Sequence, residues 1–416
     1  ATCADALVVA PAAGRAAAHL NVARAATGDF AWEMRNFENI AYVVDIEVGG
    51  QTISAIPDTG SFSLILTSKR CPAEHCRFPR AYDPSASSTY ASKGSAHGAI
   101  FGSGTVVLEG ATDQVSLPGF GPARTLHFWE VIRAGERMAH LWSWAPFQAI
   151  MGLSWKTEAP ALCKECGDNV VTEPTITGVF GKRTFTACFG KGPSYIYWGA
   201  SPPAPTSWSR IAVIAKNHWS TLMGGVTMYH TEQRKEEVAC FEKPCAALID
   251  TGATDFYVPA SMFDKLRHHV GHIAEDCSNL LILPDWRMIL LDPAGGRIEV
   301  SIPSSEYVIQ TTTHIGKRCY LRVYPDESLS GAGHPLWVLG TPFLHRYMVR
   351  YDGSTSPASV SLATHPGTCP TPQTAVLSAR IPPGGIALGA DGAASRGEGG
   401  PTADAYSFAK LGGAAV

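Results

Sequence analysis

The sequence repeats one short pattern in its two halves, and this repeat constrains the possible folds more than any other feature. An Asp-Thr-Gly tripeptide at 58–60 follows an apolar segment, and a second one at 250–252 does the same. Farther along, each is followed by two apolar residues and a glycine, at 150–152 and 338–340. The same order in both halves indicates a duplicated β unit, so we expect two similar lobes of about 170 residues each.

The composition agrees with a β-rich globular chain and argues against other classes. The chain is 45% hydrophobic and only 17% charged, with 41 glycines and 29 prolines. Short runs rich in Val, Ile, Tyr and Thr between such residues are typical of strands. The net charge of −3 gives no strong field for nucleic acid or for a membrane surface. No apolar run reaches the ~18 residues of a transmembrane helix.

Local patterns predict a few individual elements. Alternating residues predict strands at 41–48 and 52–56, with the Gly49-Gly50 pair as the turn between them. Residues 261–270 follow a proline and carry apolar residues at helical spacing, which predicts a helix. The alanine-rich stretch 12–26 also favours a short helix.

These patterns divide the chain into four parts. Residues 1–30 are an Ala-rich leader or the remnant of a propeptide, and because the chain begins with Ala1 we expect that a targeting signal has been removed. Residues 31–205 form the first lobe and residues 206–364 the second. Residues 365–416 are rich in Gly, Ala and Pro and poor in large apolar residues. We therefore expect this tail to be disordered, with Cys369 able to anchor its start.

Eleven cysteines suggest that the chain is oxidised. Several lie close together in sequence, which in a β-rich chain suggests disulfides, an oxidising compartment and the secretory pathway. The odd number leaves at least one thiol without a partner within the chain. Zinc is the alternative at Cys163-x-x-Cys166, but no second ligand pair lies nearby. The cluster of His268, His269 and His272 also lacks further ligands, so we expect no metal and no cofactor.

The two aspartates of the repeat form the candidate chemical centre. One Asp-Thr-Gly alone is an ordinary turn sequence. Asp58 and Asp250, however, both lie in apolar settings, where burying a charge is costly unless it is paired or used. Two carboxylates held together share one proton, because both cannot ionise cheaply. One then acts as a base toward water while the other, protonated, polarises a carbonyl; the pair titrates as a unit, so neither aspartate has a fixed role.

Further segments make a family resemblance visible. In chain order they are Tyr82-Asp-Pro-Ser-Ala-Ser-Ser-Thr-Tyr90, Trp144-Ala-Pro-Phe-Gln-Ala-Ile-Met-Gly-Leu153, residues 218–228, residues 302–310 and Trp337-Val-Leu-Gly-Thr-Pro-Phe-Leu344. Together with the two Asp-Thr-Gly motifs, they make residues 31–364 resemble the pepsin-like aspartic proteases, whose aspartate pairs are known to share a proton. The resemblance implies an all-β, bilobal fold with two pseudo-symmetric, β-barrel-like lobes and a few short helices.

The resemblance also implies a function and its residues. It implies an aspartic endopeptidase that cleaves protein or peptide substrates beside large hydrophobic residues and binds pepstatin-like inhibitors, as a monomer and without a nucleic-acid partner. The alternative is a catalytically weak or inactive relative that acts as a binding or structural subunit. His218 stands where an aromatic residue often borders the cleft on the leaving-group side; the alternative is a lone surface histidine without a role in the cleft. The implied residues are the catalytic Asp58 and Asp250; their supports Thr59, Gly60, Ser61, Thr251 and Gly252; the flap Phe101, Gly102, Ser103 and Gly104; the pocket Ile56, Phe101, Leu141, Phe147 and Ile150; and the disulfides Cys71–Cys76, Cys240–Cys245 and Cys277–Cys319.

The sequence departs from the family pattern at three places. Phe101 replaces the usual flap-tip Tyr, and Ile65 replaces the Trp that usually hydrogen-bonds to it. Losing both polar partners together is nearly neutral, which indicates a rewired flap. Ser61 can donate to the first aspartate, whereas Ala253 offers the second no such donor; since a lost donor raises the pKa of a carboxyl, we expect a pH optimum nearer neutral than that of the stomach enzymes. Pro57, directly before the first aspartate, has no N–H to donate.

Overall fold

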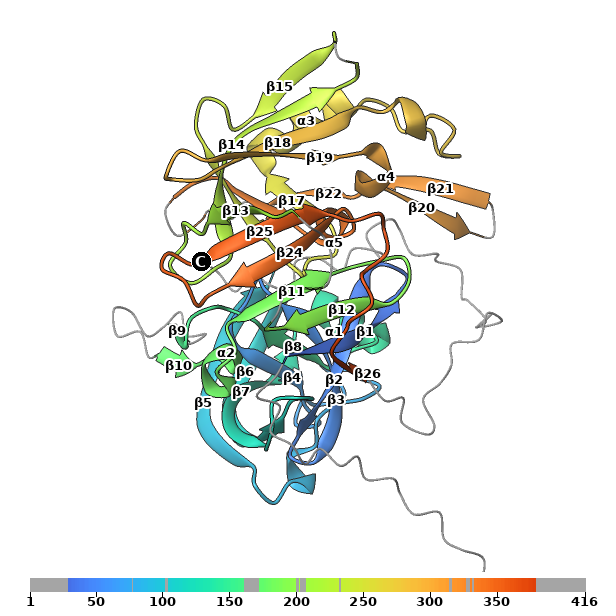
Figure 1. The fold of residues 1–416 in the computed structure, drawn as a ribbon. Helices are drawn as coiled ribbons and strands as arrows, with labels where there is room; N and C mark the ends of the chain where they lie inside the picture. The colour runs from blue at the N-terminus through green and yellow to red at the C-terminus, as the bar shows by residue number, and fades with distance from the viewer. Residues whose placement is uncertain are drawn as a thin grey trace, which may run out of the picture.

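The computed structural model describes residues 29–378, apart from gaps at 77, 102–103, 161–171, 200–201, 203–206, 232, 314–315, 327–329 and 331–332. Within this part the chain forms an all-β structure of two lobes, with a few short helices (Figure 1). No helix among these residues is long and apolar enough to cross a membrane. The helix predicted at 12–26 and the cysteines Cys3, Cys163 and Cys166 lie outside the described residues.

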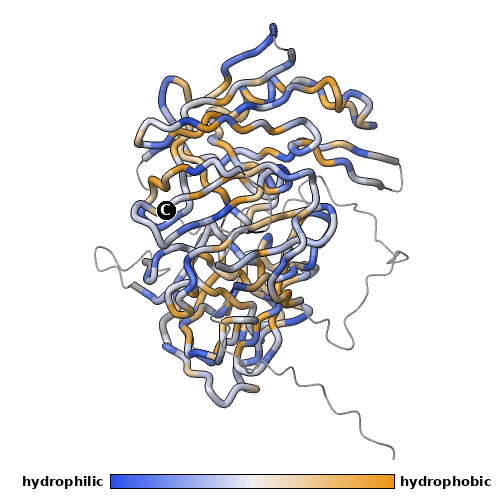
Figure 2. Tube along the Cα trace, viewed as in Figure 1, coloured by the Kyte–Doolittle hydropathy of each residue, from blue (hydrophilic) through white to orange (hydrophobic). Residues whose placement is uncertain are grey.

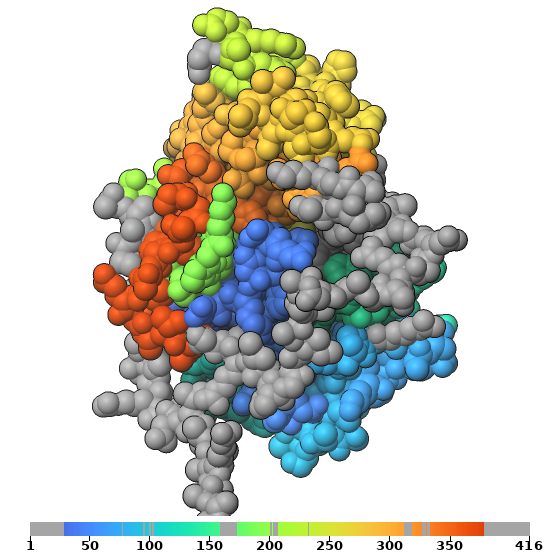
Figure 3. All heavy atoms as spheres, turned by 90° about the vertical axis from the view of Figure 1, so that its right-hand side faces the viewer, coloured from blue at the N-terminus to red at the C-terminus, as the bar shows by residue number. Residues whose placement is uncertain are grey.

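One sheet of 14 strands builds the first lobe and continues into the second, in the order β13-β25-β24-β11-β12-β1-β2-β3-β8-β4-β7-β6-β5, with β26 beside β1. Its strands are β1 (Phe30–Phe37), β2 (Ala41–Val48), β3 (Gln51–Asp58), β4 (Leu64–Thr67), β5 (Ala91–Phe101), β6 (Gly104–Ser116), β7 (Arg124–Ala134), β8 (Ala149–Gly152), β11 (Thr184–Cys188), β12 (Ser194–Trp198), β13 (Ser209–Ala212), β24 (Tyr347–Asp352), β25 (Ser359–Thr364) and β26 (Ala375–Ser378). Strands from both ends of the chain therefore meet in it. Figure 3 shows this on one face of the molecule: atoms from the middle of the sequence (green) lie between atoms from near its end (orange) and atoms from near its beginning (blue).

A second sheet of eight strands forms the other lobe, in the order β19-β18-β14-β16-β23-β17-β22, with β15 beside β14. Its strands are β14 (Ser220–Tyr229), β15 (Lys235–Ala239), β16 (Cys245–Ile249), β17 (Phe256–Pro259), β18 (Asp285–Leu291), β19 (Arg297–Ile302), β22 (Val323–Asp326) and β23 (Leu336–Leu339). Two hairpins stand apart from the sheets, β9 (Glu158–Pro160) with β10 (Thr172–Pro174), and β20 (Val308–Thr313) with β21 (Gly316–Leu321).

The helices are short and cover the sheets at a few points. They are α1 (Glu136–Trp144), α2 (Ile176–Phe180), α3 (Ala260–Val270), α4 (Ser304–Tyr307) and α5 (Thr341–Leu344), with the 3₁₀ turns η1 (Pro84–Ala86) and η3 (Leu280–Ile282). The strands predicted at 41–48 and 52–56 are confirmed as β2 and β3, and the predicted helix is α3, which begins one residue earlier. Helix α1 was not predicted; its buried residues are Met138, Leu141 and Trp142.

The repeated sequence pattern has one structural meaning in both lobes. β3, which ends in the first motif, pairs in parallel with β8, and β8 pairs antiparallel with β4. In the second lobe β16 pairs in parallel with β23, and β23 pairs antiparallel with β17. Every residue of β8, β16 and β23 is buried, which explains their uninterrupted apolar sequences. The apolar-apolar-Gly element thus supplies the strand that supports each Asp-Thr-Gly motif.

The interior of both lobes is hydrophobic, and the start of the tail is ordered. Figure 2 shows hydrophobic segments gathered along the inner strands of each lobe. The expectation of a disordered tail from residue 365 is corrected for its first residues, because β26 pairs in parallel with β1 and Cys369 forms a disulfide with Cys188. Composition alone did not reveal this pairing, which joins segments far apart in the sequence.

Candidate active site

The two aspartates of the repeat lie at equivalent strand ends. Asp58 is the last residue of β3, beside Gly152, and Asp250 directly follows β16. Both are fully buried, with 0% exposure. Each backbone is bound to the supporting segment: Asp58 O accepts from the N–H of Leu153 over 2.7 Å, and the N–H of Asp250 donates to Leu339 O over 3.0 Å. Each half of the repeat thus contributes one carboxylate.

Thr59 and Thr251 bind the two motif loops to each other through symmetric hydrogen bonds. The N–H of Thr59 donates to Thr251 Oγ1 over 3.0 Å, and the N–H of Thr251 donates to Thr59 Oγ1 over 2.9 Å. Thr59 Oγ1 also donates to Ile249 O over 2.9 Å, and Thr251 Oγ1 donates to Pro57 O over 2.7 Å. Pro57, which has no N–H, therefore takes part through its carbonyl.

Gly60 and Gly252 bring backbone donors against the carboxylates. The N–H of Gly60 donates to Asp58 Oδ1 and the N–H of Gly252 to Asp250 Oδ1, each over 2.8 Å. A Cβ atom on Gly60 would overlap the carboxylate of Asp250, and one on Gly252 would overlap that of Asp58. Only glycine permits this approach, so the absence of side chains at these positions lets the two loops close together.

The carboxyl groups of Asp58 and Asp250 lie close enough together to affect each other's protonation, and each lies against the glycine of the other motif. Burial raises the pKa of Asp58 well above its usual range, and the charge and hydrogen bond of Asp250 raise it further, while Ser61 and Gly60 as donors oppose the shift. A pair in this state holds one proton between two carboxyls. One carboxyl can then donate a proton while the other accepts one.

The two motifs differ in the residue that follows the glycine. Ser61 Oγ donates to Asp58 Oδ2 over 2.5 Å. The equivalent residue after the second motif is Ala253, which is fully buried and carries no hydroxyl. The side-chain donor available to the first aspartate at this position therefore has no counterpart in the second motif.

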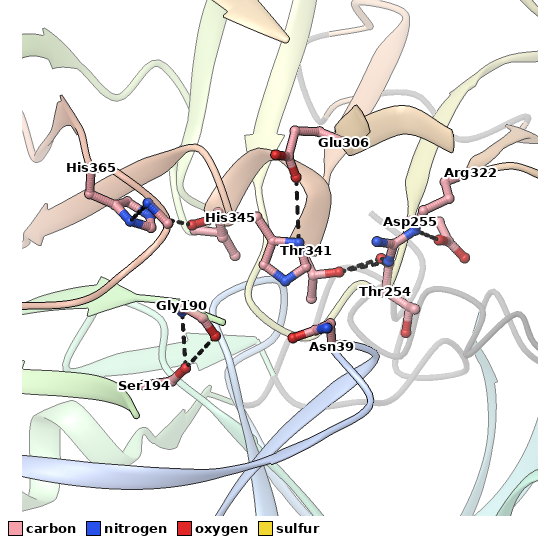
Figure 4. A network of polar contacts seen from close by, with 12 residues as sticks. Asn39, Gly190, Ser194, Thr254, Asp255, Glu306, Arg322, Thr341, His345 and His365 are labelled. Atoms are coloured by element: carbon pink, nitrogen blue, oxygen red, sulfur yellow. Dashed lines mark hydrogen bonds and ion pairs between the residues drawn. The ribbon is translucent and has the colours of Figure 1, made fainter. Parts of the chain in front are cut away.

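A buried polar network holds the loop that follows the second motif (Figure 4). Arg322 Nη2 donates to Thr254 O over 2.5 Å and to Thr341 Oγ1 over 3.0 Å, and its Nε donates to Asp255. Thr341 also binds this loop directly, since its N–H donates to Ala253 O over 2.9 Å. The loop behind Asp250 is thus fixed from one side by a single guanidinium and from the other by α5.

The residues expected to form the substrate pocket come together in one hydrophobic cluster. Its members include Ile56, Phe101, Leu141, Phe147 and Ile150, all buried, with Ile65 beside them. Phe101 and Gly104 face each other at the end of the β5–β6 hairpin, and the flap residues Gly102 and Ser103 between them lie outside the described residues. A small cavity of about 10 Å³ next to the first motif is lined by Ser61, Phe62, Ser63, Ile65, Phe101 and His218, among others.

A separate polar cavity of about 360 Å³ involves neither aspartate. Its walls include Glu306 and His345, which point toward each other in Figure 4. Their Oε2 and Nδ1 atoms lie 3.7 Å apart. Nε2 of His345 lies 2.8 Å from the hydroxyl of Tyr42 on β2. Burial lowers the pKa of His345 to about 3, and the charge of Arg322 adds to this effect. The cavity therefore contains a buried imidazole that is neutral over most of the pH range.

The cysteines of the described part form four disulfides, Cys71–Cys76, Cys188–Cys369, Cys240–Cys245 and Cys277–Cys319. Three of these join the pairs implied by the resemblance, and Cys188–Cys369 is a further one. Within the described ranges no group of three or more His, Cys, Asp or Glu side chains is placed to hold a metal ion. His269 instead pairs with Glu236.

Four residues near the first motif were not singled out by the sequence analysis. Glu173 of β10 is buried, and its carboxylate contacts Trp129 and His127 of β7 as well as Ser63. No sequence pattern marks this group, because Glu173 lies 110 residues from Ser63 and 44 residues from Trp129. Its place beside the cleft emerges only from the fold.

Comparison with known proteins agrees with this geometry. A family model described as eukaryotic aspartyl protease matches residues 41–365, most of the chain. The chain belongs to this family and has its pepsin-like fold. Among individual relatives, it is 24% identical to Renin-2 of Mus musculus over 79% of this chain and 81% of that protein. It is 24% identical to gastricsin of Suncus murinus (78% and 82% covered) and 22% identical to pepsin A of Bos taurus (77% and 83% covered).

Proposed function

We propose that this chain is an active aspartic endopeptidase, with Asp58 and Asp250 as its catalytic residues. The observation that carries the proposal is that two fully buried carboxyl groups at the ends of equivalent strands lie close enough to affect each other's protonation. Two buried negative charges in contact would repel strongly, so the two carboxyl groups are stable together when they share one proton. The symmetric threonine and glycine contacts hold the pair in register.

The proposed reaction is direct attack of water on the peptide carbonyl. One carboxylate removes a proton from the water while the protonated partner donates to the carbonyl oxygen, and the tetrahedral intermediate collapses with proton transfer to the leaving nitrogen. Because the pair titrates as a unit, the two roles belong to the pair and not to one named aspartate. Thr59 and Thr251 act by holding the loops, so they are positioning residues.

The proposed preference is for a large hydrophobic side chain beside the cleaved bond. It is supported by the apolar cluster of Ile56, Phe101, Leu141, Phe147 and Ile150, since apolar walls favour apolar side chains by burying their surface. An extended peptide would lie along the cleft by strand-like hydrogen bonding. Four disulfides support synthesis through the secretory pathway. Action as a monomer stays a prediction.

Cleavage of a hydrophobic peptide library, with and without pepstatin, tests the proposal. Wild type is expected to cleave and to be inhibited, because pepstatin mimics the tetrahedral intermediate. Asp58→Asn is expected to lose activity by several orders of magnitude while keeping its fold by circular dichroism. Equal cleavage by wild type and Asp58→Asn would show that another protein or another site is responsible. A folded wild type that neither cleaves nor binds pepstatin would favour the inactive, binding-subunit alternative.

A further inference from the structure

A buried carboxylate contacts Ser63, one of the residues that line the small cavity beside the first motif. Glu173, on the short strand β10, is 7% exposed. It accepts a hydrogen bond from Ser63 Oγ, and Trp129 Nε1 lies 3.2 and 3.1 Å from its two oxygens. Nδ1 of His127 lies 2.8 Å from its Oε2. Three donors from two other segments therefore converge on one side chain of the β9–β10 hairpin.

Ser63 links this carboxylate to the substrate side of the structure. It lines the small cavity beside the first motif together with Ile65 and Phe101. Its carbonyl accepts from the N–H of Gly152 over 3.0 Å, and Gly152 is the register partner of Asp58. Ser63 is thus fixed by its backbone to the catalytic strand pair and by its hydroxyl to Glu173.

Trp129 forms the second link. It lies directly opposite Ile65 in the parallel pairing of β7 with β4, and both belong to the hydrophobic cluster that contains Phe101. The rings of His97 and His127 lie 5.6 and 5.1 Å from the indole in edge-on contacts. Trp129 thus belongs to the same hydrophobic cluster as Ile65, and its indole N–H is directed to Glu173.

The contacts explain why a carboxylate is tolerated in this position. A buried charge needs donors, and Glu173 receives them from Ser63, Trp129 and His127. The same contacts make those groups depend on Glu173, because a buried indole N–H or hydroxyl without an acceptor costs about 1–3 kcal/mol. Removing the carboxylate would therefore release Ser63, which lines the cavity, and Trp129, which pairs with the cavity residue Ile65.

The position of this cavity indicates which part of the substrate it meets. His218 lines the same cavity, and its ring lies 5.3 Å from that of Phe62. In the family that the chain resembles, an aromatic residue at the position of His218 often borders the leaving-group side of the cleft. The cavity of about 10 Å³ holds no more than about one water molecule, so any side chain can enter it only if its walls move, and a small side chain requires the least movement.

We propose that Glu173 is a positioning residue that sets substrate specificity on the leaving-group side of the cleft. By fixing Ser63 and Trp129 it keeps the subsite narrow, so the enzyme selects compact side chains there and rejects bulky aromatic ones. This inference rests on the proposed endopeptidase function. The β9–β10 hairpin, which carries Glu173, would then contribute to substrate selection as well as to stability.

The test compares peptides that share one acyl-side sequence and carry Ala, Val, Phe or Trp at the first and second leaving-group positions. The ratio of kcat/KM for Ala or Val to that for Trp is measured for wild type, Glu173→Gln, Glu173→Ala and Ser63→Ala. Wild type is expected to favour the compact residues at least tenfold at one of the two positions. Glu173→Ala is expected to reduce that ratio at least fivefold, mainly through a lower KM for the Trp peptide, and Ser63→Ala to reduce it less.

Glu130→Gln is the matched control. Glu130 is also a buried carboxylate, adjacent to Trp129 in sequence, but its partners are Ser68, Tyr90 and Arg70. It is expected to lower the melting temperature without changing the selectivity ratio. Glu173→Gln retains the size of the side chain and serves if Glu173→Ala fails to fold.

The outcomes separate this inference from the function on which it rests. An active wild type whose ratio is the same in all folded Glu173 variants, with only stability reduced, would overturn the positioning role while leaving the peptidase intact. An equal change of the ratio in Glu130→Gln would also overturn it. A wild type that neither cleaves any peptide nor binds pepstatin refutes the proposed function, and this inference with it.

Discussion

Arg322 and Asp255 form a buried ion pair directly behind the second Asp-Thr-Gly motif. Nε of Arg322 donates to Oδ1 of Asp255 over 2.7 Å, and each side chain is only 6% exposed. Burial raises the pKa of Asp255, and the charge and hydrogen bond of Arg322 oppose that shift. Arg322 also donates to the carbonyl of Thr254. The same guanidinium therefore neutralises Asp255 and fixes the loop beside Asp250.

Asp255→Ala is predicted to destabilise the protein by about 3–5 kcal/mol, because it leaves a buried guanidinium without its counter-charge. The free energy of unfolding in urea measures the effect. The exposed pair Arg267–Asp264 provides the control: Asp264 is 83% exposed, and Asp264→Ala should change stability by less than about 1 kcal/mol. A loss below about 1 kcal/mol in Asp255→Ala would show that the loop does not depend on this pair.

The difference between Ser61 and Ala253 predicts how the pH profile responds to mutation. Ser61 donates to the first aspartate over 2.5 Å, and Ala253 has no hydroxyl with which to do the same for the second. A donor to a carboxylate stabilises its charged form and lowers its pKa. Ala253→Ser is therefore predicted to shift the kcat/KM optimum to lower pH by about one unit, and Ser61→Ala to shift it upward.

Profiles of kcat/KM from pH 2 to 8 on one hydrophobic peptide measure these shifts. The two variants should move the profile in opposite directions, which a general loss of stability cannot produce. A wild-type optimum below about pH 3 would contradict the expectation of adaptation to milder acidity. Shifts of both variants in the same direction would contradict the assignment of the hydroxyl as the tuning donor.

Much of the architecture around the aspartates could be predicted because its signals are local or repeated. Strand β2 and helix α3 follow from residue alternation, a Gly-Gly turn and helical spacing after a proline. The duplicated motif predicted two matching units, and the structure adds the reason for the repeat, since β8 and β23 support β3 and β16 in parallel. Helix α1 was missed, although it carries the buried Leu141 of the expected pocket.

The supports of the site were less predictable because they join distant segments. Arg322 lies 67 residues from Asp255, and Glu173 lies 110 residues from Ser63. In both cases a buried charge is acceptable only because the fold supplies partners that sequence patterns do not reveal. Strand β26 is a similar case: its Gly- and Pro-rich surroundings predict disorder, yet pairing with β1 orders it.

His345 predicts a specific acid sensitivity of the fold. Burial lowers its pKa to about 3, against about 6.5 when unfolded. Between these values the unfolded chain binds a proton that the folded chain does not, so this residue makes stability fall as the pH falls from about 6.5 to about 3. The charged and titratable groups around it are Arg322, His365, Lys191, Glu306 and Tyr42.

His345→Gln is therefore predicted to flatten the pH dependence, by at most about 1.4 kcal/mol per pH unit in this window. Urea unfolding at pH 7, 6, 5 and 4 gives the slope for wild type and variant. Glutamine retains a polar group able to reach the Tyr42 hydroxyl, which limits other losses. His272→Gln, at an exposed position, is the control and should leave the slope unchanged. An unaltered slope in His345→Gln would show that this imidazole is not the group responsible.

The Cys188–Cys369 disulfide is predicted to hold the start of the tail on the central sheet. It links residues 181 positions apart, and nearby the N–H of Lys191 donates to Gly367 O over 2.8 Å. Replacing both cysteines by alanine should lower stability by about 2–4 kcal/mol. It should also expose β26 to thermolysin, since only the four residues of pairing with β1 would then hold this strand on the sheet. Mass spectrometry of the digest locates the cuts.

Replacement of Cys71 and Cys76, which close a short separate loop, should leave β26 protected. If β26 stays protected without Cys188–Cys369, strand pairing alone holds the tail.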